Sequence, residues 1–118
     1  MINQEELPEV IERSIPEFSG IFKKQNCRNV YDIVRQMLKY TTKQVLNHNL
    51  KAAQKCMSLA EELYYKGNTA IKNAIENVYV YSFSHAFFCD ENKKNEVIGI
   101  VPHSLYELYK KQVINSHL

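Results

Sequence analysis

Apolar side chains recur every three to four residues along most of this chain, and few helix-breaking residues interrupt them. Because an α-helix turns once in about 3.6 residues, this spacing places apolar side chains on one helical face. The 118 residues include only three Gly and three Pro, too few for the many tight turns of a β protein. We therefore predict an all-α fold, a single domain over residues 1–118 with about five helices in antiparallel hairpins. The helices would form a bundle or pair as in armadillo and HEAT repeats.

Capping residues and breakers give the approximate ends of the first helices. Pro8 is tolerated only in the first turn of a helix, which fits an early start for the first one. Asn29 is a residue type that caps helices well, and it precedes a long apolar stripe. The predicted elements are a helix from Asn3 to about Ser14, an irregular or short helical connector over 16–25, a helix from about Asn29, and a helix from about Leu50 to Lys66.

The next helix is predicted to be central and buried. Gly67 should end the preceding helix, because Gly readily adopts the left-handed conformation found after a helix, and Asn68 or Thr69 should cap the new one. Ala74 falls on its apolar stripe, and residues 78–88, although rich in β-forming types, continue that stripe without a breaker. Asn73 is a mediocre helix former, so we expect its amide to make a structural hydrogen bond to a neighbouring turn.

The C-terminal part is predicted to contain one further helix. The charged residues 90–96 are typical of an exposed loop, and the β-branched run 97–101 favours an extended segment. Ser104 and Glu107 have the spacing of a capping box, which predicts the start of the last helix.

One segment resembles a known sequence signature. From Glu62 to Tyr79 the chain is similar to small helical bacterial proteins of poorly known role, in which Gly with Asp or Asn joins two helices ahead of an Asn-Ala pair. The resemblance covers roughly one-sixth of the chain and carries a packing motif rather than a catalytic one. Some proteins with this signature are thought to be immunity proteins of toxin systems, so it implies an immunity- or antitoxin-like inhibitor. The matching residues are Gly67, Asn68, Ile71, Asn73, Ala74 and Ile75.

The charges are unevenly distributed although the formal net charge is only +2. Eight of the fifteen Lys and Arg residues fall within residues 18–60, which contain a single carboxylate, Asp32. Such a basic stretch attracts an anionic partner when its charges share a surface. Tyr and Arg are favoured anchors of protein interfaces. The candidate partner-binding residues are Tyr31, Arg35, Lys39, Tyr40 and Lys43.

No pattern in the sequence indicates a catalytic, cofactor or metal site. The three cysteines are widely spaced without a CxxC pair, and the four histidines are far apart. His85 lies in an aromatic run and is predicted to be a buried core histidine, although Cys89 four residues later would share its helical face. Phosphate-binding and nucleophile-elbow motifs are missing from the sequence. We therefore expect a protein that is not an enzyme and needs no cofactor or metal.

Two functions remain in competition at this stage. The first is a protein-binding module with a partner of unknown identity, an immunity- or antitoxin-like inhibitor being one form. The alternative is a helical nucleic-acid-binding protein that uses the basic face of residues 28–55. Free thiols, the acidic N-terminus and the lack of a long apolar run predict a cytoplasmic protein without a signal peptide or membrane span, and homo-oligomerisation is left open. The basic face consists of Arg28, Arg35, Lys39, Lys43, Lys51 and Lys55.

Overall fold

The structure of the chain is a computed structural model that describes the backbone of residues 1–116 and the side chains of residues 1–113. This part is helical and contains no strand, which confirms the predicted all-α class. More helices form than the five predicted, because residues 16–24 and 91–97 add short ones. The elements are α1 (Leu7–Ser14), η1 (Pro16–Phe18), α2 (Ile21–Lys24), α3 (Val30–Leu46), α4 (Leu50–Lys66), α5 (Thr69–Ala74), η2 (Ile75–Val80), α6 (Tyr81–Phe87), α7 (Glu91–Val97) and α8 (His103–Ser116).

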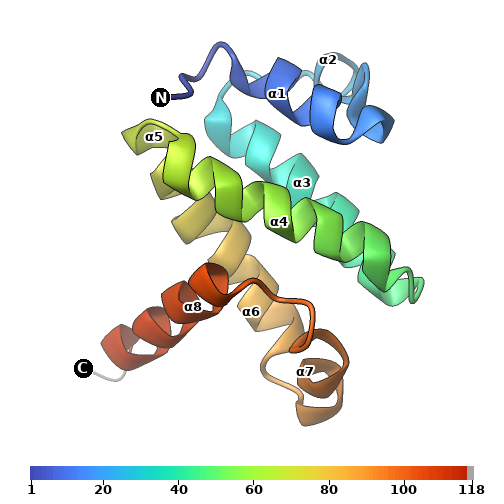
Figure 1. Cartoon of the computed structure of the whole chain (residues 1–118), viewed down its shortest axis with the longest axis vertical. Helices are drawn as coiled ribbons and strands as arrows, with labels where there is room; N and C mark the ends of the chain where they lie inside the picture. The colour runs from blue at the N-terminus through green and yellow to red at the C-terminus, as the bar shows by residue number, and fades with distance from the viewer. Residues whose placement is uncertain (117–118) are drawn as a thin grey trace.

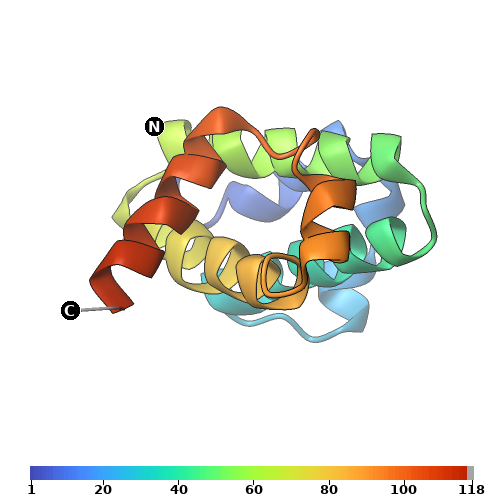
Figure 2. The ribbon, with the colours of Figure 1, turned by 90° about the horizontal axis from the view of Figure 1, so that it is seen from below.

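The helices are arranged around an antiparallel hairpin of α3 and α4. In Figure 1, α1 and α2 lie on one side of this hairpin, at the top of the view, and α6, α7 and α8 lie on its other side, below it. Figure 2 shows α4 on one side of the molecule and the α5–α6 helix on the other, with α8 running from one side to the other. Buried side chains of every layer join in one hydrophobic core. None of the helices formed by residues 1–116 combines the length and apolar character that crossing a membrane requires.

Asparagine caps fix both helices of the hairpin. The Asn29 side chain accepts a hydrogen bond from the Asp32 amide at 3.0 Å, as predicted, and Asn49 caps α4 in the same way. His48 turns the chain between them with a φ of 59°. At the N-terminus, α1 begins at Leu7 rather than at the predicted Asn3. The Asn3 side chain instead accepts the Glu6 amide and closes a turn ahead of the helix.

The joint between α4 and α5 depends on Gly67 for a steric reason. Gly67 ends α4 as predicted, but its φ of −78° is not left-handed, so that part of the expectation was wrong. A Cβ atom built at Gly67 would lie 2.5 Å from the Leu63 carbonyl oxygen and from the Ile71 side chain. Asn68 caps α5, because its side chain accepts the Ile71 amide at 3.0 Å. Only Gly therefore fits between a helix end and a helix start that pack this closely.

The N-terminal segment is hydrogen-bonded to this joint. Ile2 donates its amide to the Lys66 carbonyl at 2.7 Å and accepts the Asn68 amide at 2.9 Å. These bonds form an isolated parallel β-bridge between Ile2 and Gly67. The Lys66 carbonyl and the Asn68 amide would otherwise lack an intrahelical partner, because they lie at the end of one helix and the start of the next.

A continuous helix formed by α5, η2 and α6 passes through the centre of the molecule, and it confirms the helical prediction for residues 78–87. Its middle segment η2 packs against α3, α4 and α8. Ala74 is completely buried on it. The π-helical geometry of η2 was not predicted, and the Gln112 side chain donates a hydrogen bond to the Glu76 carbonyl within it at 2.8 Å. Asn73 was wrongly predicted to make a structural bond, because its side chain is exposed and makes no hydrogen bond within the described residues.

The region after α6 differs most from the sequence prediction. Residues 91–97 form α7 instead of a loop, because Asp90 caps them and Val97 is fully buried. Residues 98–101 form turns rather than an extended segment. The capping box is also absent: α8 already begins at His103, and Ser104 and Glu107 have other partners. The Ser104 amide donates to Glu61 on α4, and the Glu107 carboxylate pairs with Lys110 at 2.9 Å.

Candidate protein-binding surface on α3

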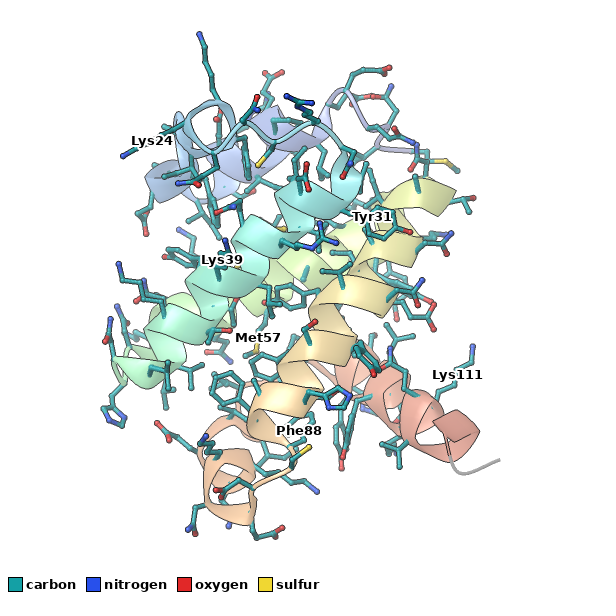
Figure 3. All side chains as sticks on the ribbon, turned by 180° about the vertical axis from the view of Figure 1, so that it is seen from behind. Lys24, Tyr31, Lys39, Met57, Phe88 and Lys111 are labelled. Carbon is teal, nitrogen blue, oxygen red and sulfur yellow. The ribbon has the colours of Figure 1, made fainter. Side chains whose placement is uncertain are left out.

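Four of the five predicted site residues follow one another along the outer side of α3. Tyr31, Arg35, Lys39 and Lys43 are spaced four residues apart, and all four are exposed. Residues four apart are neighbours on a helix surface, so they form one slowly turning row. Figure 3 shows Tyr31 at the beginning of this row and Lys39 further along α3, toward the side from which Lys24 of α2 projects.

Tyr40 does not belong to this row. It follows Tyr31 by nine residues, which turns its side chain by about half a circle around the helix axis. The Tyr40 hydroxyl donates a hydrogen bond to Glu17 at 2.8 Å, and its ring contacts Phe18 at 5.0 Å between centroids. Partial burial and the bond to Glu17 raise the pKa of Tyr40 to about 12. Tyr40 is therefore half-buried and anchors η1 to α3, whereas the sequence analysis expected it to be exposed; its part in partner binding stays a prediction.

The cations of the row differ in their partners. Arg35 forms an ion pair with Asp32 at 3.1 Å, and the second oxygen of Asp32 accepts the Arg28 amide. Lys39 and Lys43 have no carboxylate partner among the side chains that the structure describes. We call these two residues the lysine ridge. Arg35 is paired within the first turns of α3, whereas the lysine ridge has no such partner in the described structure and is available to an external anion.

Two surface hollows flank the lysine ridge, and each is lined in part by both lysines. The first, which we call the Leu46 hollow, has a volume of about 400 Å³ and contains no carboxylate. The second, the Glu17 hollow, has a volume of about 410 Å³ and lies between α3 and the η1–α2 segment. The other residues are Leu38, Thr42, Leu46 and Asn47 in the Leu46 hollow, and Glu17, Phe18, Ile21, Gln36, Tyr40 and Gln44 in the Glu17 hollow.

The electrostatic character of the two hollows is different. The hydrogen bond from Tyr40 holds the pKa of Glu17 below its usual value, and a backbone hydrogen bond and the charge of Lys55 act in the same direction. Glu17 is therefore ionised at neutral pH and offsets part of the positive charge on its side of the ridge. The Leu46 hollow has no such compensation, so the field of the lysine ridge is most favourable to anions there.

The residues of the Leu46 hollow were missed by the sequence analysis. Leu46 is 61% exposed at the C-terminal end of α3. A signal for this hollow existed, because Leu38, Thr42 and Leu46 repeat every four residues beside the core stripe. Leu38 lies next to the core stripe and is only partly buried. A second apolar stripe next to the first is the pattern that could have located this surface.

Other polar clusters in the described residues are structural. Thr41 donates to the Met37 carbonyl at 3.0 Å and bonds Tyr79 at 2.6 Å. Since the Thr41 hydroxyl has one proton, Tyr79 must be the donor in the second bond. Burial raises the pKa of the adjacent Cys56 thiol to about 11, which keeps it protonated and unreactive. The cluster joins α3, α4 and η2 inside the core.

The predicted environment of His85 was wrong. Its ring is exposed and packs against Tyr81 with centroids 4.5 Å apart, because it lies on the helical face opposite the buried Phe83 and Phe87. His85 and Cys89 both line a groove of about 250 Å³ between α6 and α8, without a hydrogen bond between them. Within the region described, no three His, Cys, Asp or Glu residues converge as metal ligands would. His117 lies outside the described residues.

Comparisons with other proteins identify the family. Neither the search of curated proteins nor the search of solved structures gave a significant match. A family model described as a domain of unknown function, DUF7674, matches residues 7–115, which include the α3 surface and the whole α3–α4 hairpin. Because this match covers most of the chain, the protein belongs to the DUF7674 family.

Proposed function

We propose that this protein is a non-catalytic protein-binding module and that the lysine ridge receives an acidic surface of its partner. The observation that carries the proposal is the position of Lys39 and Lys43, exposed and without an ion-pair partner in the described structure, between two hollows on α3. Opposite charges across an interface speed association and fix its register. The Leu46 hollow adds exposed apolar surface that a partner can bury.

A protein fits this surface better than a nucleic acid does. A phosphate backbone requires a continuous strip of cations. The basic face of residues 28–55 is interrupted, because Arg35 is paired with Asp32 and Lys55 lies near the ionised Glu17. Exposed Leu46 beside the lysine ridge favours an interface that combines charge with apolar contact, as protein interfaces do. Nucleic-acid binding remains the alternative outcome of the experiment below.

The inhibitor role implied by the sequence resemblance is a specific form of this proposal. An immunity- or antitoxin-like protein acts by covering a surface of its target, which needs no catalytic residues. Co-expression with a toxic product of a neighbouring gene would test it. Rescue of growth by the wild-type chain supports this form, and full rescue by a chain without the lysine ridge contradicts the assignment of the surface.

The main experiment compares two double charge reversals. Lys39→Glu with Lys43→Glu removes the lysine ridge, and Lys72→Glu with Lys111→Glu makes the same change in net charge on exposed positions of α5 and α8. Each protein is used to capture partners from a lysate of the native cells, and captured proteins are titrated for affinity. We expect the first variant to lose affinity by about tenfold or more, since like charges facing each other cost over 1 kcal/mol, while the second binds like the wild type.

Two controls and one outcome define the interpretation. Circular dichroism should show that both variants remain helical, because surface charge changes usually cost little stability. Salt titration against generic DNA and RNA distinguishes the alternative, for which affinity would fall steeply with salt on any sequence. Equal capture by the two variants would show that the lysine ridge is not the binding site.

A further inference from the structure

The Leu46 hollow is an open surface depression that places apolar side chains next to two lysines. Leu46 is largely exposed, and Leu38 is partly buried with its inner side against the core. Thr42 lies between them one helical turn from each, so the hollow extends along α3 rather than into the molecule. Lys39 and Lys43 stand at its edge. A bound segment with apolar and acidic groups side by side would contact the apolar hollow and pair with the two lysines.

The spacing of Lys39 and Lys43 indicates how the acidic groups of a partner should be spaced. Lys39 and Lys43 are four residues apart on one helix, which separates their Cβ atoms by about 6 Å. Two carboxylates four residues apart on a second helix have the same separation. A helix with such a pair can therefore face both lysines at once while an apolar residue of the same face enters the hollow.

The backbone of this surface favours a helical partner over an extended one. An extended peptide gains its affinity from hydrogen bonds to a free sheet edge. Residues 1–116 contain no sheet, and their single β-bridge, between Ile2 and Gly67, does not involve α3. Because the amides and carbonyls of α3 are bonded within the helix, they offer nothing to an extended chain. A partner segment must satisfy its own backbone, which a helix does.

The two hollows are not equivalent for an acidic helix. The Glu17 hollow contains an ionised carboxylate that repels it, and the Tyr40 hydroxyl there is already bonded to Glu17. The Leu46 hollow contains neither obstacle. We infer that the partner of this protein binds through an acidic amphipathic helix, whose apolar side chain occupies the Leu46 hollow and whose carboxylates pair with Lys39 and Lys43. This inference rests on the proposed protein-binding function.

Site-specific crosslinking tests the inference on the full chain. A photoreactive phenylalanine analogue is placed at Thr42, in the Leu46 hollow, and in a matched protein at Gln44, in the Glu17 hollow. Both positions are partly buried and lie on the same helix. After capture from native lysate and irradiation, mass spectrometry identifies the crosslinked segment. We expect the Thr42 position to crosslink to a helical segment with carboxylates four residues apart, at least fivefold more efficiently than the Gln44 position.

Substitutions provide an independent readout with the same captured partner. Thr42→Trp fills the Leu46 hollow and should weaken binding by about tenfold, whereas Gln44→Trp should change it by less than about twofold. Leu46→Ser alters an exposed side chain and leaves the core intact, so it tests the hollow if Thr42→Trp fails to fold. Unchanged affinity in Leu46→Ser and in a folded Thr42→Trp would overturn the inference.

The outcomes separate this inference from the proposed function. A partner protein that crosslinks through a segment without paired carboxylates, or mainly from Gln44, overturns the inference and leaves a protein-binding role in place. A nucleic acid crosslinked at either position overturns both. Failure to crosslink any partner, together with equal capture by the charge-reversal variants, also overturns both.

Discussion

The inner and outer faces of α3 differ in burial and in the partners of their polar groups. On the inner face, Val34, Met37 and Thr41 are fully buried, and the one polar group among them is bonded to Tyr79. On the outer face, Lys39 and Lys43 remain exposed without a partner in the described structure. One face of α3 therefore packs in the core, and, among the described residues, the other face makes no contact that the fold requires. Substitutions inside should change stability, and substitutions outside should change binding.

The largest effect is expected at the crowded helix joint. Gly67→Ala places a Cβ atom 2.5 Å from the Leu63 carbonyl and the Ile71 side chain, so the two helices must separate. We expect a loss of about 3 kcal/mol in the free energy of unfolding, measured by urea denaturation. Gly99→Ala is the matched control, because nothing lies within 4 Å of the added atom. Equal effects of the two changes would contradict the steric role of Gly67.

A second interior change tests the packing of the central helix. Ala74 is completely buried, and Ala74→Leu adds three carbon atoms to a filled space. The expected destabilisation is about 2 kcal/mol. Ala86→Leu adds the same atoms at an exposed position of the same continuous helix and should be nearly neutral. Thermal unfolding of the pair would separate overpacking from any general effect of leucine on helix propensity.

The buried hydroxyl pair should make a smaller contribution. Tyr79→Phe removes the hydrogen bond that Thr41 accepts but leaves the bond from Thr41 to the Met37 carbonyl. A single such bond contributes about 1 kcal/mol to stability. Tyr81→Phe removes an exposed hydroxyl and should leave the unfolding midpoint unchanged. An unchanged midpoint for Tyr79→Phe would show that the pair adds nothing to the inner face of α3.

The same cluster should make stability depend on alkaline pH. The pKa of Cys56 rises from about 9 to about 11 through burial, and the pKa values of Tyr40 and Tyr79 are also raised. Above pH 9 the unfolded chain releases the Cys56 proton while the folded chain retains it, so stability falls as pH rises to about 11. The Cys56 contribution to this fall is about 1 kcal/mol at pH 10. Cys56→Ala should flatten the decline between pH 8 and pH 10 relative to the wild type.

The smallest effect on stability is expected on the outer face. Lys39→Glu with Lys43→Glu should change the free energy of unfolding by less than about 0.5 kcal/mol, because neither lysine has an ion pair to lose within the described structure. The same protein should nevertheless lose partner binding. A large destabilisation, measured by denaturant titration, would show that the outer face also maintains the fold and would remove the distinction between the two faces.

Local signals explain why much of the fold could be predicted. Asn29 and Asn68 cap helices through bonds to amides only three residues away, so sequence spacing contains the necessary information. The stripes of α3 and α4 reflect a large buried core on one side of each helix. Residues 90–97 were mispredicted because charge dominated the pattern, although Asp90 caps α7 and Val97 anchors it in the core. One buried residue in a short helix gives too weak a periodicity to detect.

Tertiary partners account for the remaining errors. Ser104 has the spacing of a capping residue, but its amide bonds Glu61 and its hydroxyl bonds Tyr65, both on α4. The candidate site was affected in the same way. Tyr40 and Lys39 are adjacent in sequence, and only the docking of η1 shows that Tyr40 contacts Glu17 while Lys39 remains free of such a partner in the region described. Spacing along α3 could place the row of cations but could not show which of them were already paired.

The two hydrogen bonds between Ile2 and the α4–α5 joint have a consequence for the order of folding. Helical hairpins such as α3 and α4 join residues close in sequence and form quickly, because little chain entropy is lost in closing them. The bridge between Ile2 and Gly67 closes a much longer stretch of chain and contributes only two hydrogen bonds. It should therefore form after the hairpin and open before it. In native-state hydrogen exchange, the Asn68 amide would report this opening separately from the unfolding of the bundle.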